Sequence, residues 1–260
     1  MDLQLAGKVV LITGGAKGIG AAIARVCAGE GASPVIVDRD AEAGQQLERE
    51  LRQEGVKTKW IATELSNPET CRQAVTQTIQ SFGRIDALIN NAGINDRVGL
   101  EHGSPEQYRE SLQRNLLHYY DIAHFSLGFL KESKGNIVNI ASKTALTGQG
   151  GTSGYASSKG AILALTREWA VELLPYGIRV NAIVPAEVMT PLYRQWVASF
   201  PDPEEKLKTI IAKIPLEKRM TEADEIAAMA VFLISGKARH ITGQHLFVDG
   251  GYVHLDRALT

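Results

Sequence analysis

One stretch near the start decides the fold: Val9-Val10-Leu11-Ile12-Thr13-Gly14-Gly15-Ala16-Lys17-Gly18-Ile19-Gly20. A continuously apolar run leads into a glycine-rich loop, and an apolar pattern of helical period follows, so we expect a strand, a tight turn and a helix. The spacing is G-x-x-x-G-x-G, which is not a Walker A loop because no Gly-Lys-Ser/Thr closes it. Glycine permits positive φ and lets backbone N–H groups approach an anion at a helix start. The stretch therefore indicates a pyrophosphate cradle, with a ligand-free βα turn as the alternative.

The second apolar run, Pro34–Asp38, ends in a carboxylate. In a βαβ unit, an acid at that place accepts hydrogen bonds from the ribose hydroxyls of an adenosine and repels a 2′-phosphate. The alternative is that Asp38 or Asp40 caps the next helix. The order of turn, helix, strand and acid predicts a dinucleotide site, and Asp38 favours NAD. Lys17 and Arg39 are cations that could receive a phosphate, so use of NADP stays open.

The rest of the chain keeps alternating between short β-branched runs and longer amphipathic runs. We expect further strands at Thr58–Ala62, Ala87–Asn90, Asn136–Ile140, Arg179–Val184 and His245–Val248. We expect helices at Ile19–Gly29, Ala41–Glu54, Pro68–Phe82, Pro105–Lys131, Gly154–Leu174 and Glu222–Ile234. Strands this apolar are covered by helices on both faces. The pattern predicts a single-domain α/β fold of the doubly wound Rossmann type over residues 1–260, with a mostly parallel seven-stranded sheet.

Composition argues against several classes of protein. Hydrophobic residues make up 44% of the 260 residues and the net charge is -1, so neither disorder nor a bulk attraction to nucleic acid or anionic membrane is expected. The two cysteines, Cys27 and Cys71, form no C-x-x-C pair, and the histidines show no metal-ligand spacing. The first residues resemble no signal peptide, and no stretch reaches the ~18 apolar residues of a membrane span. We therefore expect a cytoplasmic protein without a metal site.

One segment breaks the alternation of strands and helices. The chain from Pro185 to Met220 is rich in proline and mixes apolar with charged residues. Connections longer than ~12–15 residues inside a compact domain are usually functional lids or disordered. This one follows a predicted strand, at the carboxyl edge where open α/β sheets bind ligands. We expect a substrate-covering lid at about 186–220, with a passive insertion as the alternative.

The residues best suited to chemistry are a tyrosine, a lysine and a serine. Tyr155 and Lys159 are one helical turn apart and share a helix face. A tyrosine with a pKa of ~10 is a poor base near neutrality, but a nearby cation favours the phenolate and lowers that pKa. Ser142 follows a predicted strand at its carboxyl end. A solvated helix face is the alternative for the tyrosine and lysine.

These residues stand in the order typical of the short-chain dehydrogenase/reductase family, which the chain resembles over essentially its whole length. The matching pieces are Thr13-Gly14-x-x-x-Gly18-Ile19-Gly20, Asn90-Asn91-Ala92-Gly93, Asn115, Ser142, Tyr155-x-x-x-Lys159 and Pro185. The resemblance implies that Tyr155 is the general acid/base. It implies that Lys159 lowers the pKa of that tyrosine and holds the nicotinamide ribose. Ser142 would bond the reacting oxygen, and Asn115 would anchor a water that relays protons.

The same resemblance extends the set of cofactor contacts. Asn91 would lie against the adenosine side, and Gly93 would let the backbone pass the cofactor closely. The expected cofactor-binding residues are Gly14, Lys17, Gly18, Ile19, Gly20, Asp38, Arg39, Glu64, Leu65, Asn91, Ala92, Gly93, Tyr155, Lys159, Pro185, Val188 and Thr190. The chain departs from the family pattern at Thr63-Glu64-Leu65, at Ala186-Glu187 after the proline, and at Lys143 after the serine.

Polar residues dominate the expected substrate pocket. Its candidate contacts are Asn95, Ser142, Lys143, Gln149, Glu187 and Trp196, with Asp96, Arg97 and Tyr193 nearby. An apolar steroid or acyl chain would leave such groups unpaired, at ~1–3 kcal/mol each when buried, whereas a sugar or polyol would satisfy them. The alternative is that most of them face solvent. The pattern favours a small polyhydroxylated substrate.

The chain, including its tail Gly251–Thr260, is also similar to bacterial aldose dehydrogenases of the L-fucose-oxidising kind. That resemblance implies oxidation of an anomeric hydroxyl to a lactone, and family resemblance implies a homotetramer. The two longest predicted helices carry apolar residues on more than one face, as expected if they also pack on a partner; these are Leu116, Leu117, Tyr119, Tyr120, Ile162, Leu165 and Trp169. The alternatives are a 3-oxoacyl or hydroxysteroid ketone reductase and a non-catalytic dinucleotide-binding regulator.

Overall fold

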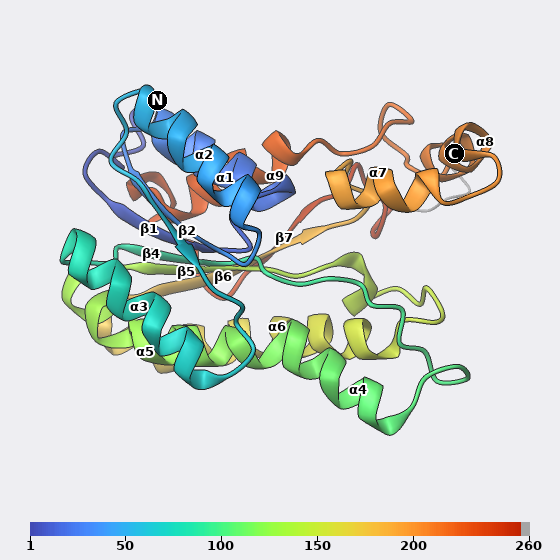
Figure 1. Ribbon diagram of the computed structural model, residues 1–260, viewed down its shortest axis with the longest axis horizontal. Helices are drawn as coiled ribbons and strands as arrows, with labels where there is room; N and C mark the ends of the chain where they lie inside the picture. The colour runs from blue at the N-terminus through green and yellow to red at the C-terminus, as the bar shows by residue number, and fades with distance from the viewer. Residues whose placement is uncertain (256–260) are drawn as a thin grey trace.

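Seven strands form one sheet in the part of the chain that the computed structural model describes, residues 1–255 (Figure 1). The strands are β1 (Val9–Thr13), β2 (Ser33–Asp38), β3 (Lys59–Ala62), β4 (Ala87–Asn90), β5 (Asn136–Ile140), β6 (Arg179–Pro185) and β7 (His245–Val248). Their order is β3-β2-β1-β4-β5-β6-β7, and every neighbouring pair is parallel. The predicted doubly wound α/β fold is confirmed. Residues 256–260, the end of the tail noted above, lie outside the described part.

Helices cover both faces of the sheet, as continuously apolar strands require. One face carries α1 (Gly18–Gly29), α2 (Ala41–Gln53) and α9 (Ala223–Ile234) (Figure 1). The other carries α3 (Pro68–Phe82), α5 (His118–Ser133) and α6 (Ser153–Glu172). The strand order reverses between β1 and β4, so the crevice outside the carboxyl ends of those strands is the place where folds of this kind bind ligands.

The predicted helix Pro105–Lys131 is wrong as one continuous α-helix. It consists of α4 (Pro105–Leu112), a π-helical turn (Gln113–Leu117) and α5. Single π-helical turns inside α-helices are frequent at functional sites. This one contains Asn115, which is fully buried. The π-helical turn leaves the apolar pattern of the flanking helices intact, so the sequence pattern did not predict the turn.

The segment after β6 holds two helices that the sequence pattern did not predict, α7 (Pro191–Ala198) and α8 (Pro203–Ile211). Each begins with a capping side chain followed by proline, a helix-start signal. Thr190 accepts a hydrogen bond from the Tyr193 N–H at 3.2 Å, and Asp202 accepts one from the Glu205 N–H at 3.0 Å. Both helices lie at one end of the sheet (Figure 1).

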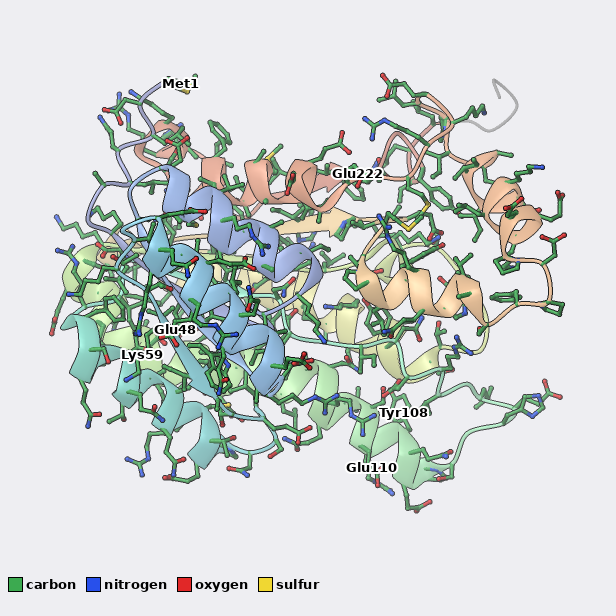
Figure 2. All side chains as sticks on the ribbon, turned by 45° about the horizontal axis from the view of Figure 1, so that its top comes forward. Met1, Glu48, Lys59, Tyr108, Glu110 and Glu222 are labelled. Carbon is green, nitrogen blue, oxygen red and sulfur yellow. The ribbon has the colours of Figure 1, made fainter. Side chains whose placement is uncertain are left out.

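Three short 3-10 turns complete the described elements. They are Lys143–Ala145, Leu174–Tyr176 and Gly236–Ala238. At the outer edge of the sheet, Glu48 of α2 accepts a hydrogen bond from the backbone N–H of Trp60 in β3; Figure 2 labels Glu48 and the neighbouring Lys59. Among residues 1–255, no helix combines the length and apolar character that crossing a membrane requires.

Candidate active site

Two glycines of the turn after β1, Gly14 and Gly20, have no room for a side chain. A Cβ on Gly20 would lie 2.1 Å from the carbonyl oxygen of Gly14, and a Cβ on Gly14, whose φ is +61°, would lie 2.8 Å from the Ala92 Cα. The Asn91 amide donates to the carbonyl oxygens of Thr13 and Gly14 at 3.0 and 2.9 Å. The loops after β1 and β4 therefore form one rigid cradle beside the start of α1. Its shape fits a dinucleotide pyrophosphate, which needs this close backbone approach.

Asp38 lies at the tip of β2, beside that cradle. One of its carboxylate oxygens accepts a hydrogen bond from the Ala16 N–H at 3.0 Å. The cap of α2 is Asp40, which accepts from the Ala43 N–H at 3.0 Å. The capping alternative for this pair of acids therefore falls on Asp40. Asp38 instead fixes the glycine turn, and its other carboxylate oxygen accepts from the Asp40 N–H at 3.0 Å.

The two cations beside Asp38 are each paired with an acid. Lys17 forms an ion pair with Asp40, which raises the pKa of the lysine above its ordinary value. Arg39 pairs with Glu64 at 2.7 Å. A 2′-phosphate would have to compete with these carboxylates for either cation. Of the other expected contacts, Leu65 is buried and Ile19 is half-buried.

Ser142, Tyr155 and Lys159 converge at the carboxyl end of β5. Ser142 is the second residue after β5, and its hydroxyl accepts a hydrogen bond from the Thr144 N–H at 3.3 Å. Tyr155, in the first turn of α6, is hydrogen-bonded to Ser142. The Lys159 Nζ lies 5.5 Å from the centre of the Tyr155 ring. The predicted trio thus shares one site, with two hydroxyls in contact and an ammonium behind them.

Lys159 is held by a residue that the sequence did not single out for this site. Its Nζ donates to the carbonyl oxygen of Ile140 at 2.7 Å and to the Tyr119 hydroxyl at 3.1 Å. Tyr119 is fully buried, and its own hydroxyl donates to Ile140 at 3.0 Å. The sequence argument counted Tyr119 among apolar packing positions. The signal that could have found it is its spacing of one turn from Asn115 on the same helical segment.

The pKa of Tyr155 departs from the expectation. Burial raises it to about 12, while the hydrogen bond to Ser142 acts to lower it. Burial also lowers the pKa of Lys159 to about 7. The expected lowering of the tyrosine pKa by Lys159 is therefore not found in this structure. The physical reason is that loss of solvent disfavours the charged form of both groups, and the hydrogen bonds of the ammonium go to other partners.

Asn115 and Gly93 lie beside Lys159. The Asn115 amide oxygen accepts a hydrogen bond from the Ile94 N–H at 2.7 Å, and its amide nitrogen is 3.4 Å from the Ser111 hydroxyl. A Cβ on Gly93 would lie 3.2 Å from the Asn115 Oδ1 and 3.6 Å from the Lys159 Nζ. The Asn115 side chain therefore ties the loop after β4 to the π-helical turn, and the absence of a side chain at Gly93 avoids a close contact with Asn115.

The helix that carries Tyr155 is tied to α4 near its start. The Tyr108 hydroxyl of α4, labelled in Figure 2, donates to the Ser157 hydroxyl of α6 at 3.0 Å. A Cβ on Gly154 would lie 2.3 Å from the Ser111 Oγ of the same helix α4. This close contact fixes the first turn of α6.

A charged cluster lies next to the serine. Lys143 forms an ion pair with Glu187, and their side chains are 9% and 13% exposed. The other carboxylate oxygen of Glu187 accepts a hydrogen bond from the Tyr193 hydroxyl at 2.7 Å. The Lys143 Nζ also stands 4.1 Å from the centre of the Tyr252 ring. Lys143, Glu187 and Tyr193, which the sequence placed in or near the substrate pocket, are thus in contact with one another. Trp196 adjoins them, with its ring 5.0 Å from that of Tyr193.

Other expected residues have different places. The Asn95 side chain accepts from the Arg97 N–H at 3.2 Å, so it shapes a turn. Gln149 is exposed in a loop outside the charged cluster. Thr190 lies against the glycine turn, because a Cβ on Gly18 would be 3.2 Å from the Thr190 Cγ2. Further along the chain, Pro185 is buried at the end of β6, and Val188 forms a parallel bridge with Thr221. In residues 1–255, no three His, Cys, Asp or Glu side chains gather as a metal site would require.

Comparisons with known proteins agree with this geometry. A protein family described as enoyl-(acyl carrier protein) reductase matches residues 14–253. L-fucose dehydrogenase of Bos taurus is 39% identical over 252 residues, which are 96% of this chain and 91% of that protein. The crystal structure of Cj0485 dehydrogenase is 46% identical with a TM-score of 0.96, covering 100% of this chain and 99% of that one. The structure of L-sorbose reductase from Gluconobacter frateurii, complexed with NADPH and L-sorbose, is 28% identical with a TM-score of 0.94, covering 98% and 100%.

The chain belongs to the short-chain dehydrogenase/reductase family, as a family match over most of its length and relatives of this similarity establish. It is a nicotinamide-dependent oxidoreductase that acts on CH–OH groups.

Proposed function

We propose that this protein oxidises a sugar, an aldose of the L-fucose type, at its anomeric hydroxyl to give a lactone. The observation that carries the proposal is the largely shielded ion pair of Lys143 and Glu187 beside Ser142. An apolar substrate would bury these charges further without supplying hydrogen bonds, whereas a polyol supplies several. The names of the relatives, L-fucose dehydrogenase and L-sorbose reductase, support the same class of substrate.

The chain's own residues perform the proton chemistry. Ser142 donates a hydrogen bond to the reacting oxygen, and Tyr155 as phenolate removes its proton. Lys159, fixed by Ile140 and Tyr119, holds the ribose next to the phenol. The Asn115 side chain is engaged by Ile94 and Ser111, so its contact to a proton-relaying water is made by its main chain. A bound oxidised nicotinamide nucleotide supplies the hydride acceptor.

NAD is the favoured nucleotide in this proposal, with NADP possible. The Asp38 carboxylate suits two ribose hydroxyls and repels a 2′-phosphate. The pairing of Lys17 with Asp40 and of Arg39 with Glu64 supports the same preference, because the extra phosphate would have to displace a carboxylate from either cation.

The surroundings of the site complete the proposal. Segment 186–220, with α7 and α8, serves as the lid of a single nucleotide-binding domain, supported by the contact of Thr190 with the glycine turn. A homotetramer in the cytoplasm is proposed as the working form. The exposed apolar side chains of α6 and of the segment around the start of α5 support the oligomer, since such patches usually mark interfaces; they are Leu117, Tyr120 and Val171.

The test is a substrate screen of the full chain with both nucleotides. L-fucose, other aldoses, polyols, an apolar secondary alcohol and a 3-oxoacyl thioester are compared by the absorbance of the reduced nicotinamide. We expect turnover to be highest with an aldose and NAD, and the product to be a lactone. Preference for the apolar alcohol or the thioester would favour the ketone-reductase alternative, and no turnover with any compound would favour the regulator.

A further inference from the structure

Four segments meet at the charged cluster beside Ser142. Lys143 is in the turn after β5, Glu187 follows β6, Tyr193 is on α7, and Tyr252 is in the turn after β7. The carboxyl ends of three neighbouring strands and the first lid helix are thus joined through side chains. We name this set the clasp: Lys143, Glu187, Tyr193 and Tyr252.

Glu187 is the centre of the clasp. One carboxylate oxygen accepts from the Lys143 ammonium and the other from the Tyr193 hydroxyl at 2.7 Å. Burial and the adjacent Glu187 raise the pKa of Tyr193 above its ordinary value, so its phenol stays a donor. Both oxygens of the carboxylate are therefore engaged by the protein, one by the catalytic loop and one by the lid.

The two lid helices themselves bury little side-chain surface, whereas the ends of the segment are anchored by the bridge of Val188 with Thr221 and by the buried Ile214 and Met220. Val197 is the one buried residue of α7, and α8 has none. Exposed ion pairs contribute little to stability, but a buried pair resists opening because separation leaves a charge without a partner in a low dielectric. In the clasp, Lys143 is buried and Glu187 is largely shielded from solvent.

The geometry points to Glu187 and Lys143 as positioning residues that fasten helix α7 to the loop carrying Ser142 and so fix the pocket wall beside the reacting carbon. Glu187 acts through Lys143 and Tyr193 and does not bind the substrate itself. The ammonium of Lys143 keeps N–H donors for a hydroxyl of the substrate. This inference rests on the proposed function for the identity of the substrate, while the fastening of the lid is independent of it.

The experiment measures amide hydrogen exchange of the unliganded full chain. Lys143→Met, Glu187→Gln and the double variant each remove the pair, and Lys143→Arg keeps its charge. Lys208→Met removes an exposed cation of the lid and is the matched control. We expect exchange within 186–220 to rise at least about tenfold in both single variants and no further in the double variant. It should stay unchanged in the control and within about twofold in Lys143→Arg.

Sugar kinetics give the second measurement. Loss of the clasp should raise the KM for the aldose about tenfold and change kcat by less than about threefold, because the lid positions the substrate and takes no proton. Lys143→Arg should restore most of the KM.

Three results would overturn the inference. They are unchanged lid exchange in the single variants, additive effects in the double variant, or an equal rise in β1 and β4, which would indicate loosening of the whole fold. A lid that loosens as expected in a protein that oxidises no sugar would instead overturn the proposed function and leave the clasp standing.

Discussion

The Lys159 ammonium donates a hydrogen bond to the Tyr119 hydroxyl at 3.1 Å. Both groups also bond the carbonyl oxygen of Ile140, so α5, β5 and α6 fix the ammonium together. Neither of these bonds goes to Tyr155, whose ring centre is 5.5 Å from the Lys159 Nζ. We infer that Lys159 acts on the reaction as a rigidly positioned group behind the phenol, and that this group carries its charge below a lowered pKa of about 7.

Tyr155→Phe should abolish turnover while nucleotide binding is retained. The variant keeps the ring and its packing but removes the phenol oxygen, which is the group that takes the proton from the substrate. General acid/base groups contribute about 10²–10⁴-fold, so kcat with an aldose should fall by at least about a hundredfold. Steady-state rates and a nucleotide titration check this. Tyr176→Phe, an exposed site, is the control, and near-normal turnover in Tyr155→Phe would contradict the proposed mechanism.

Asp38→Ala should shift nucleotide preference towards NADP. The change removes a carboxylate that suits ribose hydroxyls and repels a phosphate. We expect the Kd for NADH to rise about tenfold, in keeping with the loss of charge-assisted hydrogen bonds, and the Kd for NADPH to fall. Fluorescence titration of both reduced nucleotides measures the ratio. Glu42→Gln, an exposed acid at the start of α2, is the control. Unchanged NADH affinity without a gain for NADPH would show that Asp38 does not select the nucleotide.

The oxidation rate should rise with pH through the alkaline range. Tyr155 must lose its proton to act as a base, and burial raises its pKa to about 12. The deprotonated fraction therefore grows as pH increases, so log kcat/KM should climb with a slope of about one. Ser142→Ala removes the bond that lowers this pKa and should displace the profile to higher pH. Initial rates between neutral and alkaline pH test this, and a plateau already at neutral pH would contradict it.

His118 should make the fold sensitive to acid. Its ring is buried, its Nδ1 lacks a hydrogen-bond partner in the described structure, and burial followed by the charge of Lys159 lowers its pKa to about 4. The unfolded chain binds the proton first as pH falls below the ordinary value of 6.5, so stability is lost from there down to about 4. That loss amounts to about 3 kcal/mol from this group.

Urea unfolding across this pH range tests the prediction. His118→Gln cannot take up the proton, so its free energy of unfolding should fall less steeply with acid than that of the natural chain. His102→Gln, at a fully solvated histidine, should leave the slope unchanged. Equal slopes in the natural chain and His118→Gln would mean that His118 is protonated alike in the folded and unfolded states.

Much of the fold could be predicted because its strands are short, apolar and buried on both sides. Val9–Thr13 and Ala87–Asn90 are found as expected, and β2 begins one residue earlier, at Ser33. The glycine turn was recognisable because close backbone approaches at Gly14 and Gly20 require glycine there.

What could not be predicted depends on packing between distant segments. The pairing of Lys143 with Glu187 joins loops 44 residues apart, and no local pattern carries it. The direction of the Tyr155 pKa depends on how deeply the phenol is buried, which a spacing of one helical turn does not reveal. The role of Tyr119 could not be predicted for the same reason. An aromatic residue on an apolar helix face is interpreted as a packing residue, and the sequence does not show which group its hydroxyl bonds.

The π-helical turn at Gln113–Leu117 has a consequence for how this chain can change. Each residue advances an α-helix by about 100°, so deleting one residue there would rotate all of α5 about its axis relative to α4. Tyr119 would swing away from Lys159 even though every residue of the trio remained in place. The rotational register of α5 relative to α4 is therefore as necessary to the site as the side chains themselves. Insertions or deletions before His118 should be tolerated far less than substitutions.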